Sequence, residues 1–422
     1  MVVINQADAN WNKADTNWEE FPLPTLPLSA RLKYWLGFAY LAKFGKLEGE
    51  KAEFHQFQPS LGRTLYETGM SSLLKFCEQN LPEQTEDIPI REILSEDAPE
   101  LMPTIQKRLR PVLIKGGARN WPAMSVFNLE FFEERYGNIE VPINEEPNLY
   151  FEDNGQPVPM NNFYKMRYHT VKELIDSIRK NGNLSAKAIE DIMHIDNDVL
   201  VKQYCDINHI QRLSGYEAKK NTWLRRRYPI GKVISQQLFL QPERSHTLWH
   251  TEPGDNYFVQ ITGRKRWRFV HPLFTPGMYP VVKDHSTYHA SRLDGREEND
   301  VIARRGFPLY RYVPKFYAIV EPGDLLFMPN YWWHTVSNLP GSHTLSLTMR
   351  TISNLNLISP TWEILRYLDK TTWSIRKKML AHGRLFDEDI SAYLFSYADD
   401  DNNLREKAKH VAEVINSRAS NK

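Results

Sequence analysis

The chain has 422 residues, 41% of them hydrophobic and 25% charged, which is enough to bury a large core and excludes a disordered protein. Its 53 basic and 52 acidic residues leave a net charge of +1, which argues against a nucleic-acid partner and against binding to an anionic membrane. Two cysteines in so long a chain exclude a disulfide framework and a zinc site of several cysteines, and they favour the reducing cytoplasm.

Residues 1–100 are predicted to form an amino-terminal extension that is largely helical. The chain begins with a polar and acidic stretch that lacks the apolar core of a secretory signal, and no apolar run approaches the ~20 residues that span a bilayer. The proline-spaced segment FPLPTLPLS is not expected to be helical. A helix is predicted to follow it, and Ser29 can cap that helix. Four apolar residues recur at the spacing of one helical face: Leu32, Trp35, Leu36 and Ala39. We expect this face to pack on the protein's own core.

Residues 101–355 are predicted to form a β-rich domain. Short strand-like runs separated by glycine and proline are typical of a sandwich or barrel. These runs are PVLIKGG, KVISQQLFLQ, NYFVQI, KRWRFV, YAIV, DLLFMP and HTLSLTM. The segment TVKELIDSIRKNGN, between the first two, predicts a helix that Thr170 caps and Gly182 ends. The fold class is therefore a mainly β core with helical additions.

Residues 356–422 return to a helical pattern. Two apolar stripes support this prediction: Ile364, Leu368, Ile375 and Met379 in the first, and Leu404, Ala408, Val411 and Ile415 in the second. Helices appended to a β domain commonly form a dimer seam or a lid. We expect a homodimer through these helices.

The stretch LWHTEPGDNY contains a candidate metal-binding pair. Side chains at i and i+2 of a strand project from the same face, so His250 and Glu252 would lie side by side while Thr251 points away. The run EPGDLLFMPNYWWHTVSN leads to His334, which a facing strand can bring to the same point. Two histidines and one carboxylate on one face of an octahedral ion form the facial triad of non-haem Fe(II) oxygenases. The three remaining positions can take a chelating 2-oxo acid and dioxygen.

The strand-like run KRWRFV offers an anchor for the far carboxylate of such an acid. Alternation places Lys265 on one face with Trp267 and Phe269, where a buried ammonium needs an anion. An internal salt bridge is the alternative explanation for this lysine.

These residues resemble the Jumonji C (JmjC), or cupin-like, branch of the Fe(II)- and 2-oxoglutarate-dependent oxygenases, especially its protein asparaginyl hydroxylases. The resemblance covers about residues 101–355. It lies in HTLWHTEPGDNYFVQITGRKRWRF, in FMPNYWWHTV and in the entry segment RPVLIKGGARNWPAMSVFNLEFFEERYGN. It implies a double-stranded β-helix, or jelly roll, with Fe(II), 2-oxoglutarate and dioxygen as cofactor and co-substrates.

The resemblance also implies roles for single residues. The family's metal motif is followed, fifteen residues after its histidine, by the lysine that binds the tail of 2-oxoglutarate, and Lys265 stands at that distance from His250. Thr247 and Asn256 fall where a threonine and an asparagine contact the co-substrate, and Thr348 lies near a third such position. Glu252 departs from the aspartate of many hydroxylases and leaves the substrate class open.

Other interpretations are less favoured. His246 is spaced evenly from His250 and could replace a ligand, but Glu252 already completes the triad. A helical zinc-hydrolase pair in HTLWH would need a glutamate where Thr247 stands. A non-catalytic metal-binding cupin is the alternative from another class, and it would be expected to lose a ligand or the lysine.

The predicted activity is hydroxylation of a protein or peptide side chain, with conversion of 2-oxoglutarate to succinate and carbon dioxide. A small-molecule hydroxylase and an N-methyl demethylase are the alternatives.

Overall fold

The computed structural model describes residues 24–45, 57–144, 166–182, 184–189, 200–217, 221, 230–252, 254–281 and 289–351. The carboxy-terminal stripes, and the dimer seam assigned to them, lie outside the described residues and stay predictions.

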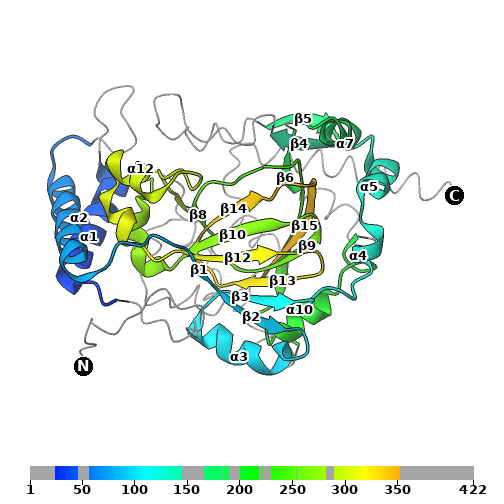
Figure 1. The fold of residues 1–422 in the computed structure, drawn as a ribbon, viewed down its shortest axis with the longest axis horizontal. Helices are drawn as coiled ribbons and strands as arrows, with labels where there is room; N and C mark the ends of the chain where they lie inside the picture. Colours follow the sequence, from blue (N-terminus) through cyan, green and yellow to red (C-terminus); the bar gives the residue numbers. More distant parts are fainter. Residues whose placement is uncertain are drawn as a thin grey trace.

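The core consists of two facing β-sheets, which run through the middle of the molecule in Figure 1. The larger sheet has the order β2 (Arg91–Leu94), β3 (Val112–Lys115), β13 (Leu325–Met328), β9 (Asp255–Thr262), β15 (Thr344–Thr351), β7 (Val233–Gln241), β6 (Ala186–Ile189). The smaller sheet has the order β1 (Ile88–Pro89), β12 (Phe316–Val320), β10 (Lys265–Val270), β14 (Trp333–Asn338), β8 (His250–Thr251), β11 (His289–Ala290). A separate ribbon pairs β4 (Glu140–Asn144) with β5 (Met166–Thr170).

All seven strand-like runs of the sequence form strands of these two sheets, which confirms the predicted β core with helical additions. Strands distant in the chain are neighbours: β15 lies between β7 and β9, and β14 lies between β10 and β8. This order brings the segment of His250 next to that of His334.

Helices cover the sheets at several places. They are α1 (Leu28–Phe44), α2 (Leu61–Asn80), α3 (Ala98–Arg108), α4 (Ala123–Val126), α5 (Leu129–Tyr136), α7 (Val171–Arg179), α10 (Ile207–Leu213) and α12 (Asn299–Arg304), with 3-10 turns η3 (Pro272–Met278) and η4 (Pro308–Tyr312). Figure 1 shows α1, α2 and α12 at one end of the sheets and α4, α5 and α7 toward the other. None of the helices in the described part of the chain has the length and apolar character that crossing a membrane requires.

The helix predicted after residue 170 is confirmed. Thr170 caps α7 through a reciprocal capping box, in which its hydroxyl accepts from the Glu173 amide and the Glu173 carboxylate accepts from the Thr170 amide. The helix ends at Arg179, shortly before Gly182.

Strand β15 of the larger sheet has one apolar and one polar face. On β15, Leu345, Leu347 and Met349 belong to the core cluster that also contains residues of the covering helices. Residues 344, 346, 348 and 350 alternate with them and are polar, yet all are buried. Phe258 of the larger sheet meets Trp267 of the smaller sheet with ring centroids 4.8 Å apart, so these second faces look into the space between the sheets.

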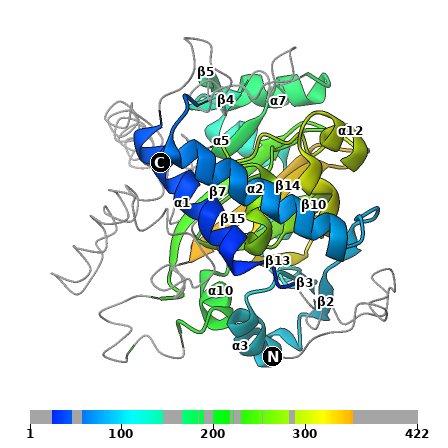
Figure 2. The ribbon, with the colours of Figure 1, turned by 90° about the vertical axis from the view of Figure 1, so that its left-hand side faces the viewer.

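The amino-terminal helices α1 and α2 pack against one end of the sheets, as Figure 2 shows. Their buried side chains, among them Tyr34 and Phe38, share one apolar cluster with Trp249 and Trp333. Those two tryptophans directly precede His250 and His334 in the chain. The extension therefore supports the backbone on which both histidines stand.

The prediction for α1 was wrong in two respects. The helix begins at Leu28 after Pro27, so Ser29 lies inside it and is not its cap. Trp35 and Ala39 are buried as expected, but Leu32 and Leu36 are 44% and 52% exposed. Because apolar residues lie all around α1, the helical spacing alone does not identify the buried face. Besides Trp35 and Ala39, that face contains Tyr34, Phe38 and Leu41.

Strands from the extension also join the two sheets. Ile88–Pro89 pairs in parallel with β12, and Arg91–Leu94 pairs in parallel with β3. The division at residues 100 and 101 stays a prediction, and the hydrogen-bonded sheets begin before it.

Candidate metal centre

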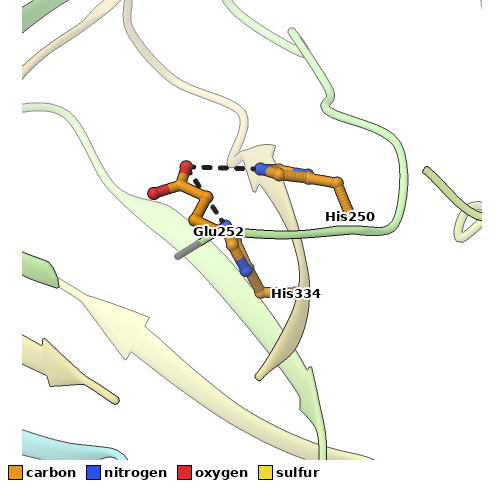
Figure 3. Close-up of side chains that lie close together, drawn as sticks. All are labelled: His250, Glu252 and His334. Atoms are coloured by element: carbon orange, nitrogen blue, oxygen red, sulfur yellow. Dashed lines mark ion pairs between the residues drawn. The ribbon is translucent and has the colours of Figure 1, made fainter. Parts of the chain in front are cut away.

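His250, Glu252 and His334 converge in the structure, as Figure 3 shows. The Nε2 atoms of His250 and His334 lie 3.6 Å and 3.8 Å from the Oε1 atom of Glu252. All three side chains are buried, and one ligand atom from each lies within 4.8 Å of the other two. Among the described residues, these three are the group of histidine, cysteine and acidic side chains whose ligand atoms lie close enough together to hold one metal ion.

Backbone pairing explains why residues so distant in sequence meet. His250 of β8 is the direct register partner of His334 of β14, and their rings lie 4.0 Å apart. The sequence argument placed His250 and Glu252 on one strand. β8 ends at Thr251, however, so Glu252 lies just beyond the strand. Its backbone carbonyl accepts a hydrogen bond from the Tyr331 amide, which ties it to the segment that leads to His334.

The backbone also fixes both imidazole tautomers. The Nδ1 atom of His250 lies 2.8 Å from the Leu248 carbonyl oxygen, and the Nδ1 atom of His334 lies 3.0 Å from the Trp332 carbonyl oxygen. A carbonyl can only accept, so each Nδ1 donates and each Nε2 carries a lone pair. Both lone-pair nitrogens face Glu252, which is the arrangement a metal ion needs.

The protonation states agree with this role. Burial, and then the neighbouring imidazole of His334, lower the pKa of His250 to about 4. Burial by itself would raise the pKa of the Glu252 carboxyl, but the charge of the Arg350 guanidinium and its hydrogen bonds hold that pKa well below its usual range. At neutral pH the site therefore presents a neutral His250 and a carboxylate, and both can bind a divalent cation.

Arg350 is a site residue that the sequence did not reveal. Its Nε and Nη2 atoms donate to Oε2 and Oε1 of Glu252 over 2.6 Å and 2.9 Å, and both side chains are buried. Arg350 lies two residues after Thr348 on β15, so an arginine on the inward side of a strand was the available signal.

Lys265 lies inside the molecule, as the alternation predicted. It is buried together with Trp267 and Phe269, while Arg266 and Arg268 are partly exposed. Trp267 stacks on the ring of His334 with centroids 5.4 Å apart, so the face of β10 that carries Lys265 leads to the histidine.

The Lys265 ammonium joins the two sheets. It donates to Asn338 Oδ1 of the neighbouring strand β14 over 2.7 Å and to Gln241 Oε1 of β7 in the opposite sheet. Neither amide was assigned to the site from the sequence. Asn338 is the register partner of Lys265 on the neighbouring strand, and Gln241 reaches the ammonium because the two sheets face each other. Hydrogen bonds to neutral oxygens hold the ammonium inside, and its pairing with the tail of a diacid stays a prediction.

The other three predicted co-substrate residues lie near the same interior. The Thr247 hydroxyl accepts from the Val336 amide over 2.9 Å. Asn256 of β9 is the register partner of Arg350. Thr348 of β15 lies between its register partners Gln237 of β7 and Phe258 of β9. The assignment of these residues to co-substrate binding stays a prediction.

Unsatisfied polar atoms mark this interior. Within the described ranges, Asn256 Oδ1 and Ser346 Oγ are buried without a hydrogen-bond partner. The Ser346 hydroxyl can donate to a carboxylate of a ligand between the sheets, whereas Asn256 Oδ1 can only accept from a donor.

His246 does not belong to the metal group. Its Nδ1 lies 2.7 Å from Ser337 Oγ and its Nε2 lies 3.3 Å from Thr335 Oγ1. β8 begins at His250, so the even spacing does not place His246 on that strand.

Comparison with known proteins agrees with this geometry. Residues 98–354, more than half of the chain, match the family described as Cupin-like domain. The chain belongs to the Cupin-like family. Among the relatives of this Cupin-like protein, the JmjC domain-containing protein D of Dictyostelium discoideum is 26% identical over 239 residues, which cover 56% of this chain and 50% of that protein.

Two further relatives of the Cupin-like protein bear different names. Lysine-specific demethylase 8 of Xenopus tropicalis is 24% identical over 238 residues, which cover 56% of this chain and 47% of the relative. HSPB1-associated protein 1 of Homo sapiens is 31% identical over 104 residues, which cover 22% of this chain and 19% of the relative. The chain thus spans half or less of the length of these relatives. The comparisons confirm the resemblance to the JmjC and cupin-like oxygenases.

Proposed function

We propose that this protein is an Fe(II)- and 2-oxoglutarate-dependent dioxygenase that hydroxylates a side chain of a protein or peptide. The observation that carries the proposal is the convergence of His250, Glu252 and His334 on one buried point, with the Nε2 lone pairs and a carboxylate oxygen facing one another. Two imidazoles and one carboxylate suit Fe(II) and leave three coordination positions for other groups.

Each part of the site has a defined task in this proposal. The triad would hold Fe(II), whose chemistry when bound is the activation of dioxygen. Lys265 would pair with the far carboxylate of 2-oxoglutarate, and the polar faces of β9 and β15 would orient the rest. Thr247, Asn256 and Thr348 are proposed to contribute hydrogen bonds. The buried surroundings keep bulk water from the reacting atoms.

The overall reaction balances without a further reductant. One 2-oxoglutarate, one dioxygen and one substrate C–H group give succinate, carbon dioxide and a C–OH group. One oxygen atom enters succinate and the other enters the substrate.

The name of one relative, lysine-specific demethylase 8, favours N-methyl demethylation as the second candidate. Demethylation begins with hydroxylation of the methyl carbon, and the product then releases formaldehyde. Glu252 is compatible with either reaction, because both use the same triad.

The decisive experiment incubates the protein with Fe(II), 2-oxoglutarate, ascorbate and either a peptide extract or a metabolite extract. Succinate formation is expected to be abolished by His250→Ala. A gain of one oxygen on peptides supports hydroxylation of a protein side chain, whereas loss of a methyl group with formaldehyde supports demethylation. A gain of one oxygen only in the metabolite extract would replace the protein substrate by a small molecule. Absence of succinate in every arm, despite bound iron, would leave a non-catalytic cupin.

A further inference from the structure

Glu252 is held by a two-pronged contact that the facial triad alone does not require. The Nε atom of Arg350 donates to Oε2 over 2.6 Å, and its Nη2 atom donates to Oε1 over 2.9 Å. Both side chains are buried, so water screens this ion pair little. A planar guanidinium fixes the plane and the direction of the carboxylate as well as its charge.

The two oxygens of the carboxylate have different surroundings. Oε1 faces the Nε2 atoms of both histidines at 3.6 Å and 3.8 Å, while Oε2 accepts the shorter of the two bonds from Arg350. An ion between the imidazoles would therefore meet Oε1, with Oε2 turned toward the guanidinium. Coordination by one oxygen preserves the three open positions that a chelating co-substrate and dioxygen require, whereas coordination by both oxygens would occupy one of them.

The local backbone explains why such a clamp is needed. Glu252 lies just outside β8, where no ladder of its own strand defines the side-chain direction, and a glutamate has one more rotatable bond than an aspartate. Arg350 stands on β15, a central strand of the larger sheet, opposite Asn256 of β9 and Ser235 of β7. A residue on a strand that is paired on both sides thus orients a ligand on a less regular segment.

We propose that Arg350 is a positioning residue that keeps Glu252 a one-oxygen ligand of the metal. This inference rests on the proposed function, because it assigns the arginine a task only if the triad binds an ion. Arg350 acts through Glu252 and is not itself assigned contact with the reacting atoms.

A competing account predicts the opposite sign. If the guanidinium only occupies the place of the cation in the metal-free protein, it competes with the metal, and its removal should tighten metal binding. If it orients the ligand, its removal should weaken binding, because partners of metal ligands typically change affinity by about 10- to 100-fold when they are lost.

The test measures binding of Co(II) and Mn(II) alone, without 2-oxoglutarate, to the full chain by calorimetry and by the visible absorption of Co(II). For Arg350→Met we expect Kd to rise about 10- to 100-fold and the Co(II) spectrum to change as the carboxylate turns. Arg350→Lys keeps the charge but not the fork, and we expect it to recover only part of the affinity. Circular dichroism shows whether Arg350→Met folds. If it does not fold, the metal affinity of Arg350→Lys tests the positioning role instead.

Arg268→Met is the matched control. Arg268 is a largely buried arginine that holds Asp87 with Nε–Oδ2 and Nη2–Oδ1 distances of 2.7 Å and 2.8 Å, on the side of β10 opposite Lys265. We expect metal affinity and the Co(II) spectrum to be unchanged in this variant.

A double-mutant cycle adds a second readout. Glu252→Asp shortens the arm by one methylene, so the acid is not expected to reach both the guanidinium and the ion. The substitution should therefore weaken Co(II) binding more in the wild-type background than in Arg350→Met.

The outcomes separate the two proposals. If the wild type binds no metal ion, the proposed function fails. If it binds one and Arg350→Met binds it equally well or more tightly, with the same spectrum, only the positioning role is overturned.

Discussion

Replacing Lys265 by methionine tests the proposed co-substrate site. The substitution keeps the length and apolar stem of a buried side chain but removes the ammonium that donates to Gln241 and Asn338. The triad is untouched, since Lys265 lies on β10 and none of its ligands does. We therefore expect the effect to fall on 2-oxoglutarate binding and not on metal binding.

The magnitude follows from the contact that is lost. A hydrogen bond to a charged group contributes roughly 1.5–3 kcal/mol. A loss of about 2–3 kcal/mol corresponds to an increase of about 30- to 150-fold in the KM for 2-oxoglutarate. The kcat at saturating co-substrate should change much less, because the end that chelates the metal remains bound.

The assay measures succinate against 2-oxoglutarate concentration, and the matched control is Lys315→Met. Lys315 is equally buried, but its ammonium donates to the carbonyl oxygens of Tyr310 and Val313, away from the triad. We expect the control to alter stability without altering KM. An unchanged KM in Lys265→Met would show that the anchor is misassigned, and an equal rise in both variants would show a general loss of structure.

Two further predictions concern stability. Gly69→Ala should lower the free energy of unfolding by about 1–3 kcal/mol in denaturant titrations, because a Cβ atom there would lie 2.4 Å from the Tyr34 backbone nitrogen of α1. The control Ser71→Ala, on the exposed side of α2, should have little effect. An unchanged denaturation midpoint in Gly69→Ala would contradict this prediction, because it would mean that α1 and α2 can move apart without loss of stability. His271 has its pKa lowered from 6.5 to about 3, by burial and then by the charge of Arg110. The unfolded chain therefore binds the proton first, so stability is lost as the pH falls below 6.5, by about 2 kcal/mol between pH 7 and pH 5. His271→Asn keeps a side-chain acceptor for the cap of η3 and should reduce this dependence; an identical pH profile would contradict the assignment.

The sequence predicted the parts of the fold that depend on local pattern. The alternation in KRWRFV placed Lys265 and Trp267 inside, and the cap at Thr170 marked the start of α7. The convergence of His250, Glu252 and His334 was also predictable, because His250 and Glu252 are close in the chain and the run before His334 has a characteristic spacing.

Other features depend on contacts between distant strands, and the local pattern does not contain them. Arg350 meets Glu252 across 98 positions of the chain, and Gln241 meets Lys265 only because the two sheets face each other. The buried face of α1 was misassigned for a related reason: Leu36 is as apolar as its buried neighbours, and packing against α2 decides which side is covered.

The central claim is that one site binds Fe(II) and 2-oxoglutarate together. Anaerobic addition of 2-oxoglutarate to the protein loaded with Fe(II) tests it most directly, because chelation of Fe(II) by the 2-oxo acid produces a visible charge-transfer absorption. We predict that this absorption forms with the wild type and is absent from His334→Ala under the same conditions. Its absence from the wild type, or its persistence in His334→Ala, would contradict the account.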